Sequence, residues 1–232
     1  MDDFARGIKQ GMPIALGYIP VSFTFGLMAV NGGIPVWIAI LISMTNLTSA
    51  GQFAGTGLII ANASLAEITL TTFVINIRYM LMSLSLSQKI TNPMPLYKKC
   101  TLAFGITDET FAVASLEKSE VSFAYMMGLI SGPYWGWALG TVLGAVTTSF
   151  LPKDLQSAMG IALYAMFIAL VVPAAKKSKA AFLVVITAVF LSSAFRWLPY
   201  LNHVSAGWSI IIATILASSV GAILFPRKED EL

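Results

Sequence analysis

The chain has 232 residues, of which 57% are hydrophobic and 11% are charged, and its mean hydropathy is +0.80. Soluble domains carry roughly 25% charged residues, so this chain has too few charges to cover a water-facing surface. The composition therefore excludes a soluble enzyme and indicates an integral membrane protein. Since roughly 20 apolar residues make one helical span, the length allows about eight spans at most. We expect one membrane domain over residues 1–232.

The residue inventory excludes several kinds of site. One cysteine, Cys100, and one histidine, His203, cannot form a disulfide framework or a Cys/His metal site, so no cofactor is expected. The chain has no G-x-x-x-x-G-K-[ST] loop, the sequence that cradles ATP phosphates, so ATP binding by this chain is not expected either. The net charge of only +3 gives no indication of a nucleic-acid partner.

Eight apolar segments follow one another, separated by short polar breaks. Their approximate ranges are 12–30, 36–60, 66–86, 100–116, 121–150, 158–175, 181–198 and 207–225. This pattern predicts an all-α fold, a polytopic membrane helix bundle with about six to eight transmembrane segments.

Basic residues gather before the first apolar segment, within 89–99, within 176–179 and at 227–228. The positive-inside rule places all four clusters, and with them both termini, in the cytoplasm. Eight simple crossings would put the cluster at 89–99 on the outside instead. The conflict disappears if two of the eight segments are interrupted and complete no net crossing, which leaves six crossings.

Two segments are the candidates for interruption. Segment 36–60 is broken by a polar stretch at 43–52, whereas segment 121–150 is too long for one span and contains Ser131-Gly132-Pro133. Broken or re-entrant helices are tolerated at membrane depth where they are buried in protein or line a cavity. We therefore predict that both segments are broken or re-entrant.

This arrangement suggests an internal repeat. Residues 1–88 and 89–176 would form two three-element units, followed by two C-terminal helices in 177–232. Transporters are often built from such repeats, with the substrate site at the repeat interface. Sequence matches at an offset of 88 residues are sparse, so the repeat is a topological hypothesis.

Arg78 lies inside an apolar segment, where a charge is expensive and by default marks a functional site. Its guanidinium cannot lose its proton, so it has to be paired or hydrated. It is either a fixed cation for a substrate carboxylate or an acidic partner, or a structural ion pair or a side chain that reaches the interface. Asn76 lies two residues away, on a different face of the same turn.

Asp108 and Glu109 are adjacent carboxylates in another apolar segment. Such a pair suits proton coupling, in which a carboxyl group binds and releases a proton as its surroundings change. Alternatively, one carboxylate is the counter-ion of Arg78 and the region is a helix start. In that alternative Thr107 is the N-cap and the acidic residues occupy the first turn.

Four further features have both a functional and a structural interpretation. Proline leaves a helix carbonyl without its donor. The helix expected over the first apolar segment, 12–30, is therefore either broken near Tyr18-Ile19-Pro20 or only kinked there. Gly51, Gln52 and Phe53 offer close backbone approach and an amide, for a substrate or for helix contacts. A glycine at every fourth position favours helix packing, more within the chain than with another chain; these are Gly136, Gly140 and Gly144. Arg196 and Glu67 are expected to be interfacial anchors.

The same residues resemble the AzlC-type branched-chain amino acid permeases, the LIV-E export family. Order and spacing agree over about residues 1–170, and one departure is Ser49-Ala50, where the family often has an earlier glycine. The matching pieces are Gly11 with Pro13, Gly17-Tyr18-Ile19-Pro20 with Phe25-Gly26, Ala50-Gly51-Gln52-Phe53, Asn76-Ile77-Arg78-Tyr79 with Leu81-Met82 and Ser83-Leu84, and Thr107-Asp108-Glu109 with Phe111.

The resemblance implies a secondary transporter that exports leucine, isoleucine, valine and related amino acids such as methionine across the bacterial inner membrane. It also implies a small, separately encoded membrane partner of the AzlD type. Asp108 and Glu109 suit coupling to the proton motive force. The rival interpretations are a non-transporting scaffold or sensor subunit and a passive amino acid channel.

A zwitterionic substrate needs a cation or helix N-terminus, an acceptor for its ammonium group and an apolar pocket. We assign its carboxylate to Arg78 or to N–H groups near Gly51 and Gln52. The ammonium group would bind Asp108 or Glu109 and the backbone around Tyr18. The expected substrate-binding residues are Tyr18, Pro20, Gly51, Gln52, Phe53, Asn76, Arg78 and Phe111, with Phe23 as a further apolar candidate and Asp108 and Glu109 as proton-coupling residues.

Overall fold

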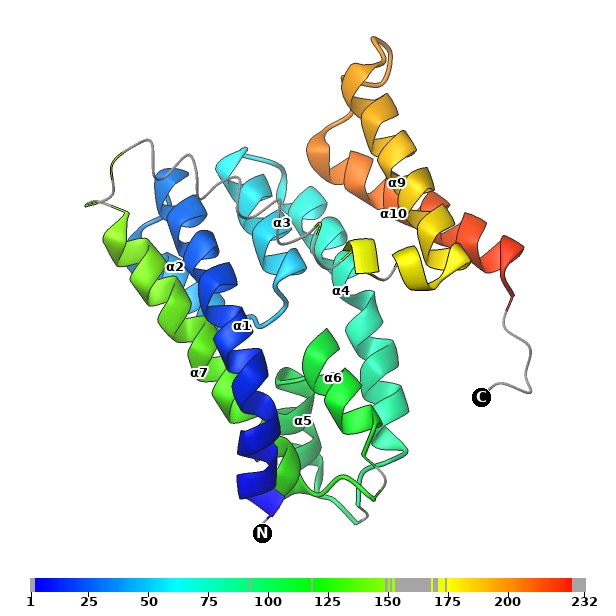
Figure 1. Cartoon of the computed structure of the whole chain (residues 1–232). Coiled ribbons are helices and arrows are strands. Elements are labelled where there is room, and N and C mark those ends of the chain that lie inside the picture. Colours follow the sequence, from blue (N-terminus) through cyan, green and yellow to red (C-terminus); the bar gives the residue numbers. More distant parts are fainter. Residues whose placement is uncertain are drawn as a thin grey trace.

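The computed structural model describes residues 3–226 apart from 92, 118, 149, 151, 153–167, 169, 170 and 174. Within these residues the chain is helical, and its β-bridge between Ile90 and Val121 is isolated (Figure 1). The helices are α1 (Asp3–Asn31), α2 (Val36–Thr45), α3 (Ala50–Ile60), α4 (Leu65–Ser87), α5 (Leu96–Phe104), α6 (Asp108–Ser115), α7 (Phe123–Thr147), α9 (Lys179–Trp197) and α10 (Ala206–Leu224).

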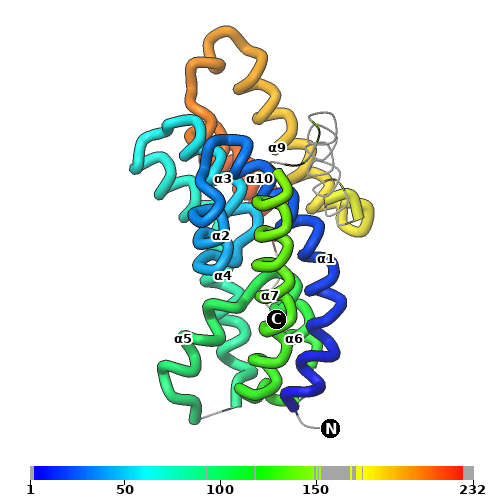
Figure 2. The backbone as a smooth tube through the Cα atoms, turned by 90° about the vertical axis from the view of Figure 1, so that its left-hand side faces the viewer, coloured from blue at the N-terminus to red at the C-terminus, as the bar shows by residue number. Residues whose placement is uncertain are grey.

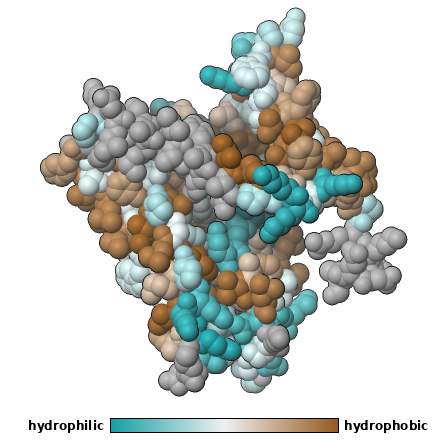
Figure 3. Space-filling view, viewed as in Figure 1, coloured by the Kyte–Doolittle hydropathy of each residue, from teal (hydrophilic) through white to brown (hydrophobic). Residues whose placement is uncertain are grey.

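Several helices are suited to cross a membrane. Among the described residues, α1, α4, α9 and α10 are long and apolar enough to do so, and α7 has 25 residues, or about 37 Å at 1.5 Å per residue. Hydrophobic residues cover much of the outer faces of α9 and α10 (Figure 3). Large side chains such as Phe73, Leu81 and Phe190 are 60% exposed or more. An apolar surface of this extent belongs in lipid, and the predicted all-α membrane helix bundle is confirmed.

Two pairs of short helices form hairpins that do not cross the bundle. α2 and α3 have 10 and 11 residues, and α5 and α6 have 9 and 8. At 1.5 Å per residue each reaches about 12–17 Å, roughly half of a ~30 Å hydrocarbon core. The α2–α3 pair lies beside the last turns of α1, and the α5–α6 pair lies at the end of the bundle where α1 begins (Figures 1 and 2). The hairpins therefore enter from opposite ends, and their turns, at 46–49 and 105–107, lie toward the middle.

The first predicted interruption is confirmed and the second is wrong. Segment 36–60 is the α2–α3 hairpin, but 121–150 contains α7, which is continuous through Pro133. Proline removes the helical donor to the carbonyl of residue 129, and this carbonyl lies against Gly11 of α1 instead. The second broken element is 100–116, where α5 ends at Gly105 and Thr107 caps a new helix.

The ends of the helices bring basic clusters together. An Arg6 Nη1 to Glu117 Oε2 ion pair of 3.4 Å joins the start of α1 to the α6–α7 connection. Lys89 Nζ, after α4, donates to the carbonyl oxygens of Ser115 at 2.6 Å and Glu117 at 2.9 Å. The clusters at the start of α1 and after α4 therefore lie at the same end, as the predicted topology requires. The assignment of this end to the cytoplasm stays a prediction, and residues 227–228 lie outside the described part.

The repeat hypothesis also stays a prediction. Residues 1–88 contain α1, the α2–α3 hairpin and α4. Residues 89–176 begin with the α5–α6 hairpin and α7, and much of this unit beyond α7 lies outside the described residues.

Glu67 in the first turn of α4 is not an exposed anchor. Its side chain is buried, and its Oε1 atom accepts hydrogen bonds from Ser205 Oγ at 2.5 Å and from the Gly207 backbone N at 2.8 Å. A carboxylate at a helix N-terminus is favoured by the unpaired N–H groups there. Glu67 therefore caps α10 and holds the α9–α10 pair against α4.

α1 and α7 run parallel and touch through their backbones. Five glycines at four-residue spacing, which lie on one face of a helix, are Gly128, Gly132, Gly136, Gly140 and Gly144 of α7. A Cβ atom at Gly136 would lie 2.7 Å from the Ala15 carbonyl oxygen, and one at Gly144 would overlap the Phe23 carbonyl oxygen. The predicted role of the stripe in packing within the chain is confirmed.

We predict that Gly11→Ala lowers the melting temperature of the detergent-purified protein, because a methyl group there would overlap the Leu129 carbonyl oxygen. Overpacking costs about 1–3 kcal/mol, and each kcal/mol shifts the midpoint by roughly 2–4 °C in a chain of this size. The matched control is Gly17→Ala on the same helix, since a Cβ atom at Gly17 meets nothing within 4 Å. Equal melting temperatures for the two variants would contradict the packing described for α1 and α7.

Candidate functional site

The turns of the two hairpins meet the middle of α4 around a cavity of about 260 Å³. Its walls are polar on the side of the α2–α3 turn and α4, and apolar on the side of α5 and its turn. The polar lining residues are Thr45, Asn46, Thr48, Asn76 and Tyr79, and the apolar ones are Leu47, Ala103, Phe104 and Ile106. Ligand pockets typically combine apolar walls with a few converging polar groups in this way.

The start of α3 has no side-chain cap and follows directly on the cavity residue Thr48. Ser49 at the N-cap has a φ of 42° and makes no side-chain hydrogen bond to the helix, so backbone N–H groups of the first turn have no side-chain cap. Gly51 lies against the side chains of Asn76 and Thr48. Asn76 Oδ1 is buried without a hydrogen-bond partner. The region offers a free amide oxygen, and the helix N-terminus beside it favours anions.

The start of α6 is capped and acidic. Thr107 Oγ1 accepts from the Thr110 backbone N at 3.3 Å, and Thr110 Oγ1 accepts from the Thr107 backbone N at 2.8 Å. Asp108 and Glu109 occupy the first helical turn, where the helix dipole favours carboxylates. The alternative in which this region is a helix start is therefore the one observed.

A chain of polar contacts joins the two hairpins through α4. Asp108 Oδ2 forms an ion pair of 2.9 Å with Arg78 Nη2, and both side chains are 42% exposed. Arg78 Nη2 also lies 3.2 Å from the hydroxyl oxygen of Tyr79, which in turn lies 3.4 Å from the carbonyl oxygen of Thr48. Arg78 thus has an acidic counter-ion and sits directly behind Tyr79 in the cavity wall.

Tyr18 connects α1 to α6. Its hydroxyl donates to Glu109 Oε2 at 2.5 Å and lies 2.8 Å from Thr107 Oγ1. The Tyr18 ring packs edge-on against Trp137 of α7, with the ring centroids 5.2 Å apart. The hydroxyl of Tyr18 therefore ties the first turn of α6 to the middle of α1.

Gln52 is buried, and its side-chain amide makes contacts between helices. Its Nε2 donates to Ser43 Oγ at 2.5 Å, and its Oε1 accepts from Trp137 Nε1 at 3.0 Å. Ser43 Oγ continues to Thr141 Oγ1 at 2.7 Å. Gln52 therefore joins α3 to α2 and α7, the structural alternative considered for it, although it also borders a second cavity beside α3.

The structure does not bring every expected residue to the first cavity. α1 is continuous through both prolines, and Pro20 is exposed. Phe53 is buried against Phe25, with ring centroids 5.4 Å apart. Phe23 and Phe111 are partly buried, and neither lines the cavity. Its apolar wall consists instead of residues from the α2–α3 turn and from α5 with its turn.

Asn46, Thr48, Tyr79 and Phe104 are cavity residues that were not expected as site residues. For three of them the sequence contains a feature from which their place in the cavity could have been predicted. Asn46 and Thr48 are part of the polar interruption itself, and Tyr79 follows Arg78 directly. Polar residues in a membrane break have to be buried in protein or line a cavity, and that rule points to them. Phe104 carries no such signal.

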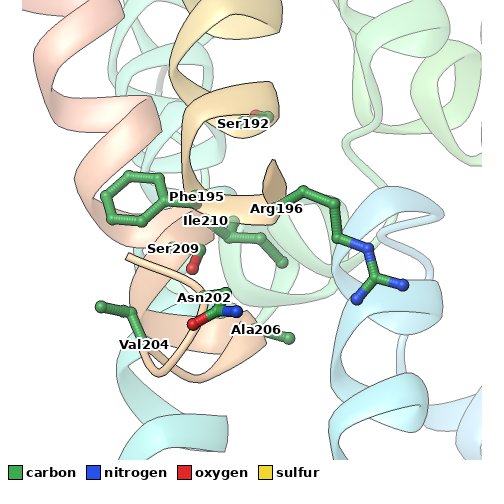
Figure 4. A pocket seen from close by; sticks show the side chains of 8 residues that line it. All are labelled: Ser192, Phe195, Arg196, Asn202, Val204, Ala206, Ser209 and Ile210. Atoms are coloured by element: carbon green, nitrogen blue, oxygen red, sulfur yellow. The ribbon is translucent and has the colours of Figure 1, made fainter. Parts of the chain in front are cut away.

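A larger cavity, of about 310 Å³, lies at the α9–α10 connection (Figure 4). Arg196 points away from Phe195 in this view and is exposed, next to exposed Trp197 and Tyr200. This placement suits the interfacial anchor expected for Arg196. Among the described residues lining it, none carries a buried polar atom that lacks a partner, so the cavity at the hairpin turns is the stronger candidate site.

The described part of the chain contains no group of three or more His, Cys, Asp or Glu residues that could hold a metal ion. Long apolar helices and two short hairpins whose turns border a partly polar cavity define a multi-pass helical membrane protein.

The chain belongs to the AzlC family, because residues 13–151 match the family of the AzlC protein. The match runs from α1 to the end of α7 and includes all residues that line the cavity at the hairpin turns. The inner membrane protein YgaZ of Escherichia coli (strain K12) is 33% identical over 171 residues, which cover 71% of this chain and 70% of that protein.

Two further relatives are named only as uncharacterized membrane proteins. The one from Archaeoglobus fulgidus is 34% identical over 172 residues, which cover 73% of this chain and 75% of the relative. The one from Helicobacter pylori (strain 26695) is 29% identical over 243 aligned positions and covers both chains completely. No solved structure matches the chain.

We predict that Gln52→Ala lowers the melting temperature, since it leaves the buried Trp137 Nε1 without its partner and removes one of the two side-chain contacts of Ser43 Oγ. An unsatisfied buried polar group costs about 1–3 kcal/mol. The control is Gln88→Ala, because Gln88 is exposed at the end of α4 and should tolerate the change. Tryptophan fluorescence should shift in the Gln52 variant alone, and an unchanged spectrum and midpoint would contradict the assigned contacts.

Proposed function

We propose that this chain is a secondary transporter that exports branched-chain amino acids, namely leucine, isoleucine and valine, together with methionine, and that export is coupled to the proton motive force. Membership in the AzlC family, whose members are membrane proteins linked in general to transport, supports this proposal. The observation that carries it is the cavity between the hairpin turns, with the Arg78–Asp108 ion pair behind its wall.

The ion pair suits a zwitterionic substrate. A free amino acid carries a carboxylate, which can replace Asp108 on Arg78, and an ammonium group, which can replace Arg78 on Asp108. The exchange brings no net charge into the membrane, where an unpaired charge is costly. Both side chains are 42% exposed, and they lie behind Tyr79 rather than in the cavity lining itself. Arg78 Nε is a further donor without a partner.

The remaining polar groups and the apolar wall match the rest of such a substrate. Asn76 Oδ1 can accept from the ammonium group, and the uncapped start of α3 can donate to the carboxylate. Leu47, Phe104 and Ile106 offer an apolar surface for a branched side chain. The volume of about 260 Å³ lies below the ~300–1,000 Å³ of drug-sized ligand pockets, which favours a single amino acid over a peptide.

Glu109 is the residue to which we assign proton coupling in this conformation, because Asp108 is already paired with Arg78. Ionised Glu109 accepts a 2.5 Å hydrogen bond from Tyr18. Protonation would replace this charge-assisted bond with a weaker neutral one and would loosen α6 from α1. A proton that binds at Glu109 would thereby change how one wall of the site is held.

The proposal includes three further elements; the first two rest on the family resemblance, and the third rests on the positive-inside rule. The transporter works with a small AzlD-type membrane subunit, lies in the bacterial inner membrane and has both termini in the cytoplasm. The relative from E. coli is named as an inner membrane protein. The rival functions, a scaffold or sensor subunit and a passive channel, are separated from the proposal by measurements of transport.

The first experiment measures counterflow of labelled leucine into liposomes that hold this chain and unlabelled leucine, without and with the small partner. We expect exchange above that of protein-free liposomes. Arg78→Ala should lower exchange about tenfold, as the loss of roughly 1.4 kcal/mol of binding does. The matched control, Arg196→Ala, should not change it. No exchange in either preparation would favour the scaffold, and normal exchange by both Arg78→Ala and Asp108→Asn would contradict the site.

A second experiment tests proton coupling. We expect Glu109→Gln, which imitates the protonated carboxyl, to retain leucine counterflow and to lose the acceleration by an imposed pH gradient. Glu120→Gln is the control, because Glu120 is exposed and does not line the cavity. A wild-type rate that does not respond to the gradient would favour a passive channel. A normal response of Glu109→Gln would move the coupling role away from Glu109.

A further inference from the structure

A second cavity, of about 250 Å³, lies on the other side of the α2–α3 turn. It shares Thr45 and Asn46 with the first cavity, so the turn of this hairpin stands between the two. Its lining comes from α2, α3, α4 and the turn, and consists of Ile42, Thr45, Asn46, Gly51, Gln52, Gly55, Thr56, Ile59, Ile68 and Thr72.

One face of α4 connects the cavities. Tyr79 and Asn76 line the first cavity, and Thr72 and Ile68 line the second. The four residues are spaced by three, four and four positions, which places them on one side of a helix. From Ile68 to Tyr79 the rise is about 16 Å at 1.5 Å per residue, or roughly half of the ~30 Å hydrocarbon core. The two cavities therefore follow one another along the membrane normal.

The second cavity extends toward the end of the bundle opposite the N-terminus. Ile59 lies in the last turn of α3, and Ile68 lies in the first turns of α4. The α5–α6 hairpin, which enters from the N-terminal end, contributes to the first cavity but not to the second. Each cavity is thus associated with a different end of the molecule.

The boundary between the cavities is a contact between α3 and α4. Gly51 lies against the Asn76 side chain, and a Cβ atom there would be 2.5 Å from Asn76 Oδ1. The same oxygen is buried without a hydrogen-bond partner. A polar group held at a constriction without a partner in the described chain can accept from an ammonium group that passes it, since burial of an unpaired acceptor is otherwise unfavourable.

The lining of the second cavity has the same mixed chemistry as that of the first. The polar residues Thr56, Thr72 and Asn46 line a space that isoleucine side chains also border. A small zwitterion with an apolar side chain fits this combination for the reasons given for the first cavity.

We infer that the second cavity is another chamber of the substrate route, so that an apolar amino acid passes from the first cavity to the second along α4, with Asn76 over Gly51 as the constriction between them. The inference rests on the proposed function. It adds Ile68, Thr72 and Thr56 to the residues that meet the substrate.

The test uses cysteine accessibility in proteoliposomes. The native Cys100 is exposed and is first replaced in a Cys100→Ser background. Thr72→Cys, a change of similar size, then reports on the second cavity. Phe73→Cys is the control, because the adjacent side chain is 60% exposed on the outer surface of α4 and its thiol would face lipid. The reagent is a positively charged methanethiosulfonate, which reaches only thiols in contact with water.

We expect the reagent to modify Thr72→Cys but not Phe73→Cys. Leucine at ten times its dissociation constant should slow the modification of Thr72→Cys about tenfold, since only about one site in eleven is then empty. The inference is overturned if leucine counterflow is intact and Thr72→Cys is either unmodified or modified at the same rate with and without leucine. Absence of leucine counterflow in both the wild type and the Cys100→Ser background is a different result, because it overturns the proposed function itself.

Discussion

Backbone groups at membrane depth have to find partners inside the protein, and the two hairpin turns make this constraint acute. Each turn exposes the ends of two helices in a region where lipid offers no hydrogen bonds. The helix that follows each turn is capped in a different way. Thr107 and Thr110 form a reciprocal capping box at the start of α6, whereas α3 begins without a side-chain cap. The polar chain through Tyr79 and Arg78 then ties one turn to the other.

The sequence predicts the elements whose signals are local. A polar stretch inside an apolar segment indicated the α2–α3 break, and Thr107 before two acidic residues indicated a helix start. The second hairpin was missed because 100–116 has the length of a single span. Pro133 led instead to the prediction that segment 121–150, which contains α7, is interrupted. α7 nevertheless continues through Pro133, with Gly11 of α1 against the released carbonyl, and no local pattern shows such a contact.

The candidate site divides in the same way. Arg78 and its acidic neighbours stood out because charges are rare in apolar segments, and their pairing was one of two open alternatives. The contacts from Tyr18 to Glu109 and from Gln52 to Trp137 join residues 91 and 85 positions apart. Such partners depend on how helices pack, which hydrophobic periodicity does not specify. The same is true of Phe104, whose place in the cavity wall results from where α5 ends.

The pairing of α1 with α7 has a consequence for the order of synthesis. α1 is the first described helix to leave the ribosome, yet the glycine-rich surface against which it packs belongs to α7, which comes after five other helices. The close backbone contact cannot form while those helices are being inserted. α1 therefore remains in the membrane without its α7 contact until α7 is inserted. The α5–α6 hairpin contacts both α1 and α7, so it also reaches its final packing only after α7 is inserted.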